Sequence, residues 1–153
     1  MPAKFLLALL LAIVLPAQAQ EAPDWFAESF LLLQEDIADA AKDGKRVMLY
    51  LWQEGCPYCK RLVSVTFRDP KIIENTRRGF VPLAINVFGD REVTWTDGRK
   101  MSEKQFAVML NVRATPTLIF FDEGGRIVLR LEGYVSPEKF APALDAAARR
   151  YPG

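Results

Sequence analysis

The chain has 153 residues, with 20 Lys and Arg against 19 Asp and Glu, so its formal net charge is only +1. This balance lacks the basic excess that nucleic-acid binders carry, and we expect no nucleic-acid partner. The chain contains no histidine, which excludes His-ligated metal sites, Cys–His catalysis and a Cys-x-x-Cys-His haem attachment site. The length suits a single domain with one core.

The first twenty residues have the pattern of an export signal. Lys4 precedes an apolar stretch from Phe5 to Leu15, and residues 16–19 then supply a proline and small side chains. The stretch is shorter than the roughly 20 residues that cross a bilayer, and the pattern is typical of a cleavable signal peptide. We therefore expect residues 1–19 to be removed on export to the periplasm and residues 20–153 to form one domain. An uncleaved membrane anchor is the alternative.

The first part of the expected domain is a helix followed by a buried strand. Apolar side chains at spacings of four and three predict a helix from Asp24 to Asp43, which Gly44 would end. Its inward positions would be Phe26, Phe30, Leu33, Ile37 and Ala40. Val47–Trp52 is apolar throughout, which favours a central strand covered on both faces.

Two helices and a second strand are expected next. The first helix begins at the cysteines and extends to Phe67. Asp69 and Pro70 suit an N-cap and a first helical position, and Gly79 would end that second helix. Phe80–Phe88 would form the second strand.

Turn and capping signals follow this strand. Gly89–Lys100 is polar and contains Thr96-Asp97-Gly98, which is typical of a turn in a loop or hairpin. Ser102 and Gln105 have the spacing of a capping box, and they predict a helix that runs to about Asn111.

A hairpin and a final helix complete the expected domain. Thr117–Phe121 and Arg126–Leu131 would be strands joined by the turn Asp122-Glu123-Gly124-Gly125. Ser136-Pro137 would start the last helix, in which Pro142 predicts a bend. Its inward side chains would be Phe140, Leu144 and Ala148. This element order predicts an α/β fold with a mixed sheet and helices on both faces.

The only two cysteines of the chain stand in the motif Cys56-Pro57-Tyr58-Cys59. At the start of a helix, unpaired N–H groups and the helix dipole favour a thiolate, the nucleophile of disulfide exchange. Cys56 can then attack a substrate disulfide, and Cys59 can resolve the mixed disulfide, which indicates a dithiol–disulfide oxidoreductase. Two alternatives stay open. One is a static disulfide, which would contribute only about 2 kcal/mol or less, and the other is a non-enzymatic module that binds a soft ion such as Cu(I).

Two stretches of the chain resemble the thioredoxin superfamily. They are Leu51–Lys60, which holds the cysteine motif, and Val112–Phe121, which holds Thr-Pro-Thr at the head of a strand pair. The segment Asn86–Val93 is similar to the exported SoxW-like thioredoxins of sulfur-oxidation systems. The resemblance implies a thioredoxin fold, with a mixed central sheet flanked by helices, an N-terminal helix and a short insertion before the third helix.

Several site residues are implied by this resemblance. Cys56 would be the attacking thiol and Cys59 the buried resolving thiol. Pro116 matches the cis-proline of the family and has no N–H to donate, which leaves Thr115 free to pair with an extended substrate. The other residues implied to lie at the substrate surface are Pro57, Tyr58, Trp52 and Gly133. From the residues alone, Trp52 is equally a core aromatic, Gly133 a turn glycine, and the Thr115–Pro116 bond an ordinary trans bond.

Three positions depart from the thioredoxin pattern. Tyr50 stands where thioredoxins have a buried aspartate, Gly55 replaces the usual tryptophan, and the dipeptide Pro57-Tyr58 is the one found in glutaredoxins. These changes leave the mechanism of disulfide exchange intact. They do not determine the direction of electron flow. A disulfide oxidase or isomerase-like donor and a glutathione-dependent enzyme are therefore alternatives.

We expect the protein to reduce disulfides of selected exported proteins. A reductant in an oxidising compartment needs electrons delivered across the membrane. The resemblance implies a membrane thiol transporter of the CcdA or DsbD kind as electron donor, and a sulfur-carrier protein or an apocytochrome as acceptor. We expect a monomer with no metal and no cofactor beyond the redox-active disulfide of Cys56 and Cys59.

Overall fold

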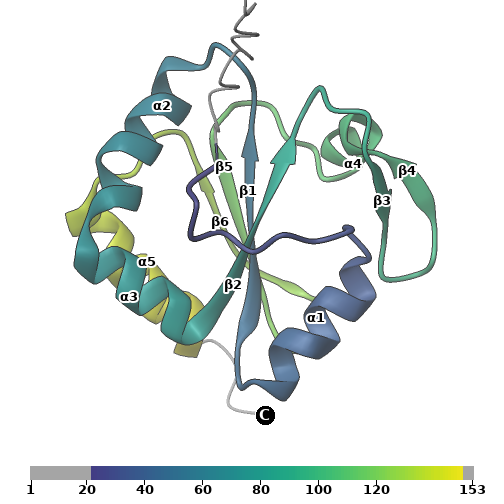
Figure 1. Cartoon of the computed structure of the whole chain (residues 1–153), viewed down its shortest axis with the longest axis horizontal. Helices are drawn as coiled ribbons and strands as arrows, with labels where there is room; N and C mark the ends of the chain where they lie inside the picture. Colours follow the sequence, from purple (N-terminus) through teal and green to yellow (C-terminus); the bar gives the residue numbers. More distant parts are fainter. Residues whose placement is uncertain (1–21, 150–153) are drawn as a thin grey trace, which may run out of the picture.

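The computed structural model describes residues 22–149 and contains a four-stranded sheet (Figure 1). Its strands lie in the order β2 (Phe80–Asn86), β1 (Arg46–Trp52), β5 (Thr117–Phe121) and β6 (Ile127–Glu132). β1 pairs with β2 in parallel, whereas the β1–β5 and β5–β6 pairs are antiparallel. The predicted mixed sheet is thus confirmed. The predicted signal peptide over residues 1–19 lies outside the described residues.

Helices cover both faces of this sheet (Figure 1). One face carries three helices and a short 3-10 turn: α2 (Pro57–Ser64), η1 (Thr66–Arg68), α3 (Pro70–Gly79) and α5 (Pro137–Arg149). The other face carries α1 (Leu33–Lys42) and α4 (Glu103–Met109). The arrangement places the cysteine motif at the start of α2, directly after β1.

β1 separates two hydrophobic cores. Val47, Leu49 and Leu51 belong to the core under α1 and α4. Met48 and Tyr50 belong to the core under α2, α3 and α5. Because alternate side chains of a strand point to opposite faces, a strand covered on both sides has to be apolar throughout. The burial of β1 confirms the prediction of a central strand covered on both faces.

The predicted helix from Asp24 to Asp43 is wrong in its first half. α1 begins only at Leu33, and residues 24–32 form an irregular segment that crosses β2 at the edge of the sheet (Figure 1). There the Ala27 N–H donates a hydrogen bond of 2.9 Å to the Pro82 carbonyl. The segment therefore partly covers the edge strand, which would otherwise present unpaired backbone groups.

The aromatic side chains of this segment do not share one face, which explains the error. Phe26 packs against Tyr50 and Phe67 in the core under α2, with ring centroids 5.9 and 5.3 Å apart. Phe30 is 92% exposed, whereas Leu33 is buried in the other core. A continuous helix would keep all three predicted positions on one side. The chain leaves helical geometry because it has to reach both cores.

The helix that carries the cysteines also ends earlier than predicted. α2 stops at Ser64, and Phe67 falls in the 3-10 turn η1. The break occurs where the Thr66 hydroxyl turns inward and donates a hydrogen bond of 2.6 Å to the Val135 carbonyl. A tertiary contact thus competes with helix continuation at this point.

Two smaller details differ from the sequence prediction. β2 ends at Asn86 instead of Phe88, because the chain turns there and the Gly89 N–H donates to the Asn86 carbonyl (2.8 Å). In α5 the buried residue after Leu144 is Ala147, and Ala148 is exposed. Residues three and four positions after Leu144 both return to the same helix face, so the sequence pattern alone did not decide between Ala147 and Ala148.

The insertion between β2 and α4 is a small hairpin. Its strands are β3 (Glu92–Thr94) and β4 (Lys100–Ser102), and they pair in antiparallel orientation. The predicted turn at Gly98 joins them. The predicted capping box at the start of α4 is confirmed between Ser102 and Gln105.

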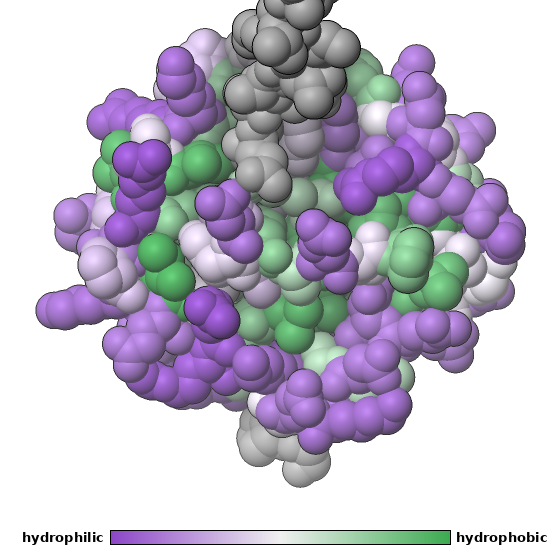
Figure 2. Space-filling view, viewed as in Figure 1, coloured by the Kyte–Doolittle hydropathy of each residue, from purple (hydrophilic) through white to green (hydrophobic). Residues whose placement is uncertain are grey.

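The surface of the described part is mixed in polarity. On the face drawn in Figure 2, hydrophobic side chains form separate patches among hydrophilic ones. None of the helices within residues 22–149 is long and apolar enough to cross a membrane. The large apolar side chains that stay mostly exposed include Phe30, Tyr58, Phe88 and Val108. A single exposed apolar residue is ordinary, so only its placement makes it informative.

Candidate functional site

The cysteine motif is positioned by the end of β1 and the start of α2. Between them, Gly55 has φ +72°, a left-handed conformation that glycine adopts without a steric penalty. Cys56 then takes an extended conformation as the N-cap residue of α2, and Pro57 occupies the first helical turn. Both cysteine side chains are nearly buried, at 7% exposure for Cys56 and 3% for Cys59.

Cys56 and Cys59 form a disulfide, with their Cα atoms 5.2 Å apart. The backbone N–H of Cys59 donates a hydrogen bond of 3.1 Å to Cys56 Sγ. This is the geometry of a side chain that caps a helix N-terminus, where the helix dipole is positive. The predicted placement of the first sulfur at a helix N-terminus is therefore confirmed, and it favours a thiolate at Cys56 in the reduced state.

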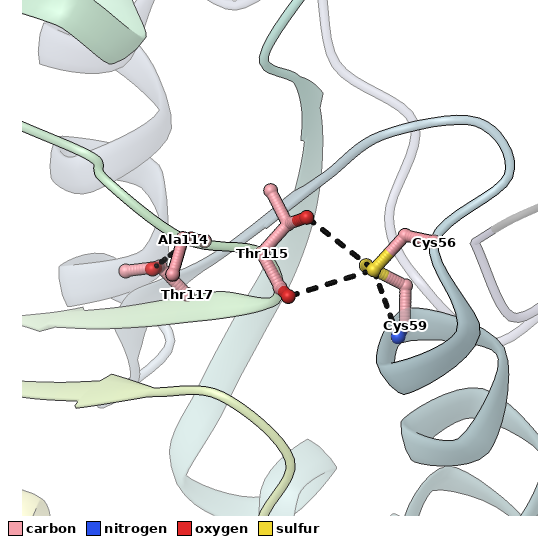
Figure 3. Close-up of a disulfide and its surroundings, with 5 residues drawn as sticks. All are labelled: Cys56, Cys59, Ala114, Thr115 and Thr117. Atoms are coloured by element: carbon pink, nitrogen blue, oxygen red, sulfur yellow. Dashed lines mark hydrogen bonds between the residues drawn. A yellow bond between two sulfur atoms is a disulfide. The ribbon is translucent and has the colours of Figure 1, made fainter.

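Thr115 contacts the same sulfur from a distant part of the chain (Figure 3). Its hydroxyl donates a hydrogen bond of 3.3 Å to Cys56 Sγ, and its carbonyl oxygen lies 3.5 Å from that atom. The peptide bond from Thr115 to Pro116 is cis. The register of the sheet explains the contact, since Leu51 near the end of β1 pairs with Thr117 at the start of β5.

Gly133 lies next to Pro116. Its N–H donates a hydrogen bond of 2.8 Å to the Pro116 carbonyl, and its φ of +80° again suits glycine. The next residue, Tyr134, has its ring 4.5 Å from the guanidinium carbon of Arg61 on α2. The loop after β6 therefore connects the Thr115–Pro116 turn to the helix that carries both cysteines.

The other predicted site residues lie around this centre with different exposure. Tyr58 is 60% exposed and Pro57 is also exposed, so both are open to a partner on the helix surface. Trp52 is half-buried against the core that contains the two cysteines. Pro57, Tyr58 and Trp52 therefore lie at the margin of the site. The residues that the structure brings together at its centre are Cys56, Cys59, Thr115, Pro116 and Gly133.

Tyr50 occupies the apolar side of the site. It is fully buried in the cluster that contains both cysteines, and its ring packs against the ring of Phe67 at 5.6 Å. Cys59, the more buried of the two cysteines, belongs to this core of aromatic and aliphatic side chains. Such surroundings favour a neutral thiol over a thiolate.

Sequence reasoning missed the contact between Arg61 and Tyr134. Arg61 is exposed on α2, and its guanidinium lies over the Tyr134 ring. A cation over an aromatic face contributes about 0.5–1 kcal/mol at an exposed site. No local spacing signals a contact between residues so far apart in the chain.

The described part of the chain shows no cluster suited to a metal ion. Within residues 22–149, no group of three or more Cys, His, Asp or Glu side chains converges on one point.

Residues 33–148 match the family model described as a thioredoxin-like domain. The chain belongs to this family. Two relatives are named thiol:disulfide interchange protein DsbD. The one from Haemophilus ducreyi is 31% identical over 109 residues and covers 69% of this chain, and the one from Escherichia coli O6:H1 is 33% identical over 103 residues and covers 66%. The chain spans only 17% and 16% of the length of these two relatives.

Solved structures of thioredoxin-like proteins have the same fold. A thioredoxin from Thermus thermophilus superposes with a TM-score of 0.62 at 25% identity, covering 78% of this chain and 85% of that one. The oxidised C-terminal domain of DsbD from Neisseria meningitidis gives a TM-score of 0.56 at 20% identity, with coverage of 78% and 96%. The predicted thioredoxin fold is thus confirmed, and the likeness to SoxW-like proteins stays a prediction.

Proposed function

We propose that this protein is an exported thiol:disulfide oxidoreductase that reduces disulfides of selected periplasmic proteins. The observation that carries the proposal is the environment of Cys56 Sγ. This sulfur accepts hydrogen bonds from the Cys59 N–H and the Thr115 hydroxyl at the N-terminus of α2. Both donors stabilise a thiolate, which is the form that attacks a disulfide.

The reaction consists of two exchange steps. The Cys56 thiolate attacks one sulfur of the substrate disulfide, forms a mixed disulfide and releases the other substrate sulfur as a thiolate. The Cys59 thiol then loses its proton and attacks Cys56 Sγ. This step forms the Cys56–Cys59 disulfide and releases the second substrate sulfur as a thiol after protonation. The substrate gains two electrons and the protein loses two.

The residues around the sulfur pair suit an extended substrate. Pro116 has no N–H and Thr115 lies half-exposed beside Cys56, so a substrate strand can pair with the backbone at residue 115. The remaining contacts would come from Pro57, Tyr58, Trp52 and Gly133. Pro57 and Tyr58, which are exposed, would contact the partner protein directly.

The reductase direction rests on export and on the relatives. A protein freed of residues 1–19 in the periplasm would need electrons from across the membrane. We assign a membrane thiol transporter of the CcdA or DsbD kind as donor, because this chain resembles part of proteins named DsbD. The resemblance of Asn86–Val93 to SoxW-like proteins favours a sulfur-carrier protein as acceptor, with an apocytochrome as the second choice. The protein would act as a monomer and without a bound cofactor.

The proposal is tested by trapping partners in the native host. A Cys59→Ser variant keeps the attacking sulfur but cannot resolve the mixed disulfide, so partners should accumulate on Cys56. Non-reducing electrophoresis and mass spectrometry identify them, and a variant with both cysteines changed to serine is the matched control. If the single and double variants capture the same proteins, the proposed exchange does not occur.

The direction is tested by the reduction potential of the pair, measured by equilibration of the purified protein with glutathione buffers. A value near that of thioredoxin, about −270 mV, supports a reductase. A value near about −120 mV, as in a strong exported oxidant, would reverse the direction that we assign.

A further inference from the structure

The segment Asn86–Arg91 lies beside the loop that leads to Cys56. The Val87 N–H donates a hydrogen bond of 2.8 Å to the carbonyl of Trp52, the last residue of β1, so that the chain stays paired with β1 for one residue beyond the end of β2. Trp52 is four positions before Cys56. Since β1 and β2 are parallel, the chain segments that leave their carboxyl ends emerge at the same edge of the sheet.

A buried carboxylate on α4 holds both ends of this segment. The Glu103 side chain is only 2% exposed. Its carboxylate accepts hydrogen bonds from the backbone N–H of Asn86 (3.0 Å) and from that of Arg91 (3.3 Å). It also forms an ion pair of 2.6 Å with the Arg91 guanidinium. A buried charge requires such partners, and here the partners all belong to the segment.

The middle of the segment is fixed as well. The Gly89 carbonyl accepts a hydrogen bond of 3.1 Å from the Lys104 N–H, and the backbone of Gly89 packs so closely on Glu103 that a Cβ atom would overlap the carboxylate. The Phe88 N–H donates to the Asn86 side-chain oxygen at 3.0 Å. The turn is therefore immobilised on both sides of Phe88.

Phe88 points its ring into solvent from this fixed turn, with 65% of its surface exposed. An aromatic side chain has few rotatable bonds, and its backbone here is already ordered. The entropic cost of binding through such a residue is small. Tyr58, at 60% exposure on the first turn of α2, is a second exposed aromatic at the same edge of the sheet.

We propose that Phe88 is a specificity-determining residue that packs against an apolar side chain next to the disulfide of the substrate protein. The inference rests on the proposed function, because it assigns a substrate contact to the dithiol site. Glu103 and Arg91 act as positioning residues that hold the Phe88 turn. The substrate class is accordingly narrowed to exported proteins whose reducible disulfide has an apolar neighbour.

The test uses two disulfide-cyclised peptides of one sequence that differ only in a Leu or a Ser next to a cysteine. The reduced protein is mixed with each peptide, and the rates of peptide reduction are followed by chromatography. The wild-type protein should reduce the Leu peptide about fivefold faster, the size expected for partial burial of one apolar side chain. In Phe88→Ala this ratio should fall to about one, and Phe88→Tyr, which keeps the ring, should retain it.

Val108→Ala is the matched control, since Val108 is 74% exposed on α4 and lies outside the segment. It should keep the wild-type ratio. If Phe88→Ala retains the preference, or if the wild-type protein shows none while reducing both peptides, the role of Phe88 is overturned and the proposed function stands. If the wild-type protein reduces neither peptide, the proposed function fails and the role of Phe88 fails with it.

Discussion

The two sulfur atoms of the site share one core but differ in hydrogen bonding and in burial, although only two residues separate them. Cys56 Sγ accepts hydrogen bonds from a backbone N–H and from the Thr115 hydroxyl. Both cysteines belong to the core that contains Tyr50 and Leu62, and Cys59 is the more buried, at 3% exposure against 7% for Cys56. Donors favour a thiolate and apolar contacts favour a thiol. The asymmetry supports the assignment of Cys56 as the attacking sulfur.

The contribution of Thr115 to this asymmetry can be measured. Thr115→Val removes the hydroxyl but keeps the shape of the side chain, so the reduced Cys56 thiolate loses one of its two donors. A hydrogen bond to a charged group is worth about 1.5–3 kcal/mol at best, and at this half-exposed site we expect iodoacetamide to alkylate Cys56 about fivefold more slowly at mildly acidic pH. Thr115→Ser keeps a hydroxyl and should react like the wild type. Equal rates for the Val and Ser variants would show that the hydroxyl does not act on the sulfur.

The residues of the site differ in how far the sequence could reveal them. Cys56 and Cys59 form a local pattern, and the position of a sulfur at a helix N-terminus follows from the strand and helix around it. The contact of Thr115 with Cys56 joins residues 59 positions apart, and only the family resemblance pointed to it. The Arg61–Tyr134 contact had no signal at all, because neither periodicity nor spacing encodes a contact between two distant surface residues.

At the scale of elements, the sequence predicted those helices and strands whose structure depends on a local pattern of residues. The apolar run of β1 and the capping box of α4 are local signals, and both are confirmed. The prediction of a helix over residues 24–32 was wrong because the apolar side chains of this segment lie in different environments. Phe26 enters one core, whereas Leu31 enters the other. A helical spacing in the sequence cannot show that a chain crosses a sheet edge between two such residues.

The hairpin of β5 and β6 depends on one buried carboxylate in its turn. Asp122 Oδ1 accepts hydrogen bonds from the N–H groups of Gly124 (2.9 Å) and Arg126 (2.8 Å), and Oδ2 accepts one from the Arg126 guanidinium. Burial acts to raise the pKa of Asp122, but the hydrogen bonds from Arg126 and Gly124 together outweigh it and hold the pKa below its usual range. The folded state therefore prefers the ionised carboxylate.

Asp122→Asn should destabilise the protein in a pH-dependent way. The pKa of Asp122 is lower in the folded than in the unfolded state, so its stabilisation is present above the unfolded pKa and is lost as the pH falls through the folded one. We expect the variant to lose about 1–2 kcal/mol of unfolding free energy at pH 7, and the difference from wild type to shrink below about pH 4. Urea unfolding at several pH values measures both.

The matched control for this prediction is Asp97→Asn in the other hairpin. Asp97 forms a similar set of contacts with Arg99, but at 47% exposure its charge is screened by water. Its loss should change the stability much less. A pH-independent loss in Asp122→Asn would show that the charge of the turn carboxylate is not what stabilises the hairpin.

At the scale of the whole molecule, the segment before α1 joins the two cores across the sheet edge (Figure 1). On one side, the Trp25 indole N–H donates a hydrogen bond of 3.1 Å to the Phe67 carbonyl, and the two rings pack at 5.7 Å. On the other side, Leu31 is buried under α1, and its carbonyl accepts a hydrogen bond from the Thr94 N–H of the inserted hairpin. The segment therefore makes contacts on both faces of the sheet, the face that carries the cysteines and the face that carries the inserted hairpin.

These contacts predict an unequal response to two aromatic substitutions in the same segment. Trp25→Ala removes the hydrogen bond and the ring contacts with Phe67, and for a half-buried tryptophan we expect a loss of about 2 kcal/mol and a fall in Tm of about 5–10 °C. Phe30→Ala removes a ring that is 92% exposed and should stay within about 0.5 kcal/mol of the wild type. Thermal unfolding measured by circular dichroism distinguishes the two variants. Equal Tm values for the two variants would mean that the crossing segment does not hold the cores together, since of the two substituted residues Trp25 packs against the core that contains the cysteines and Phe30 is mostly exposed.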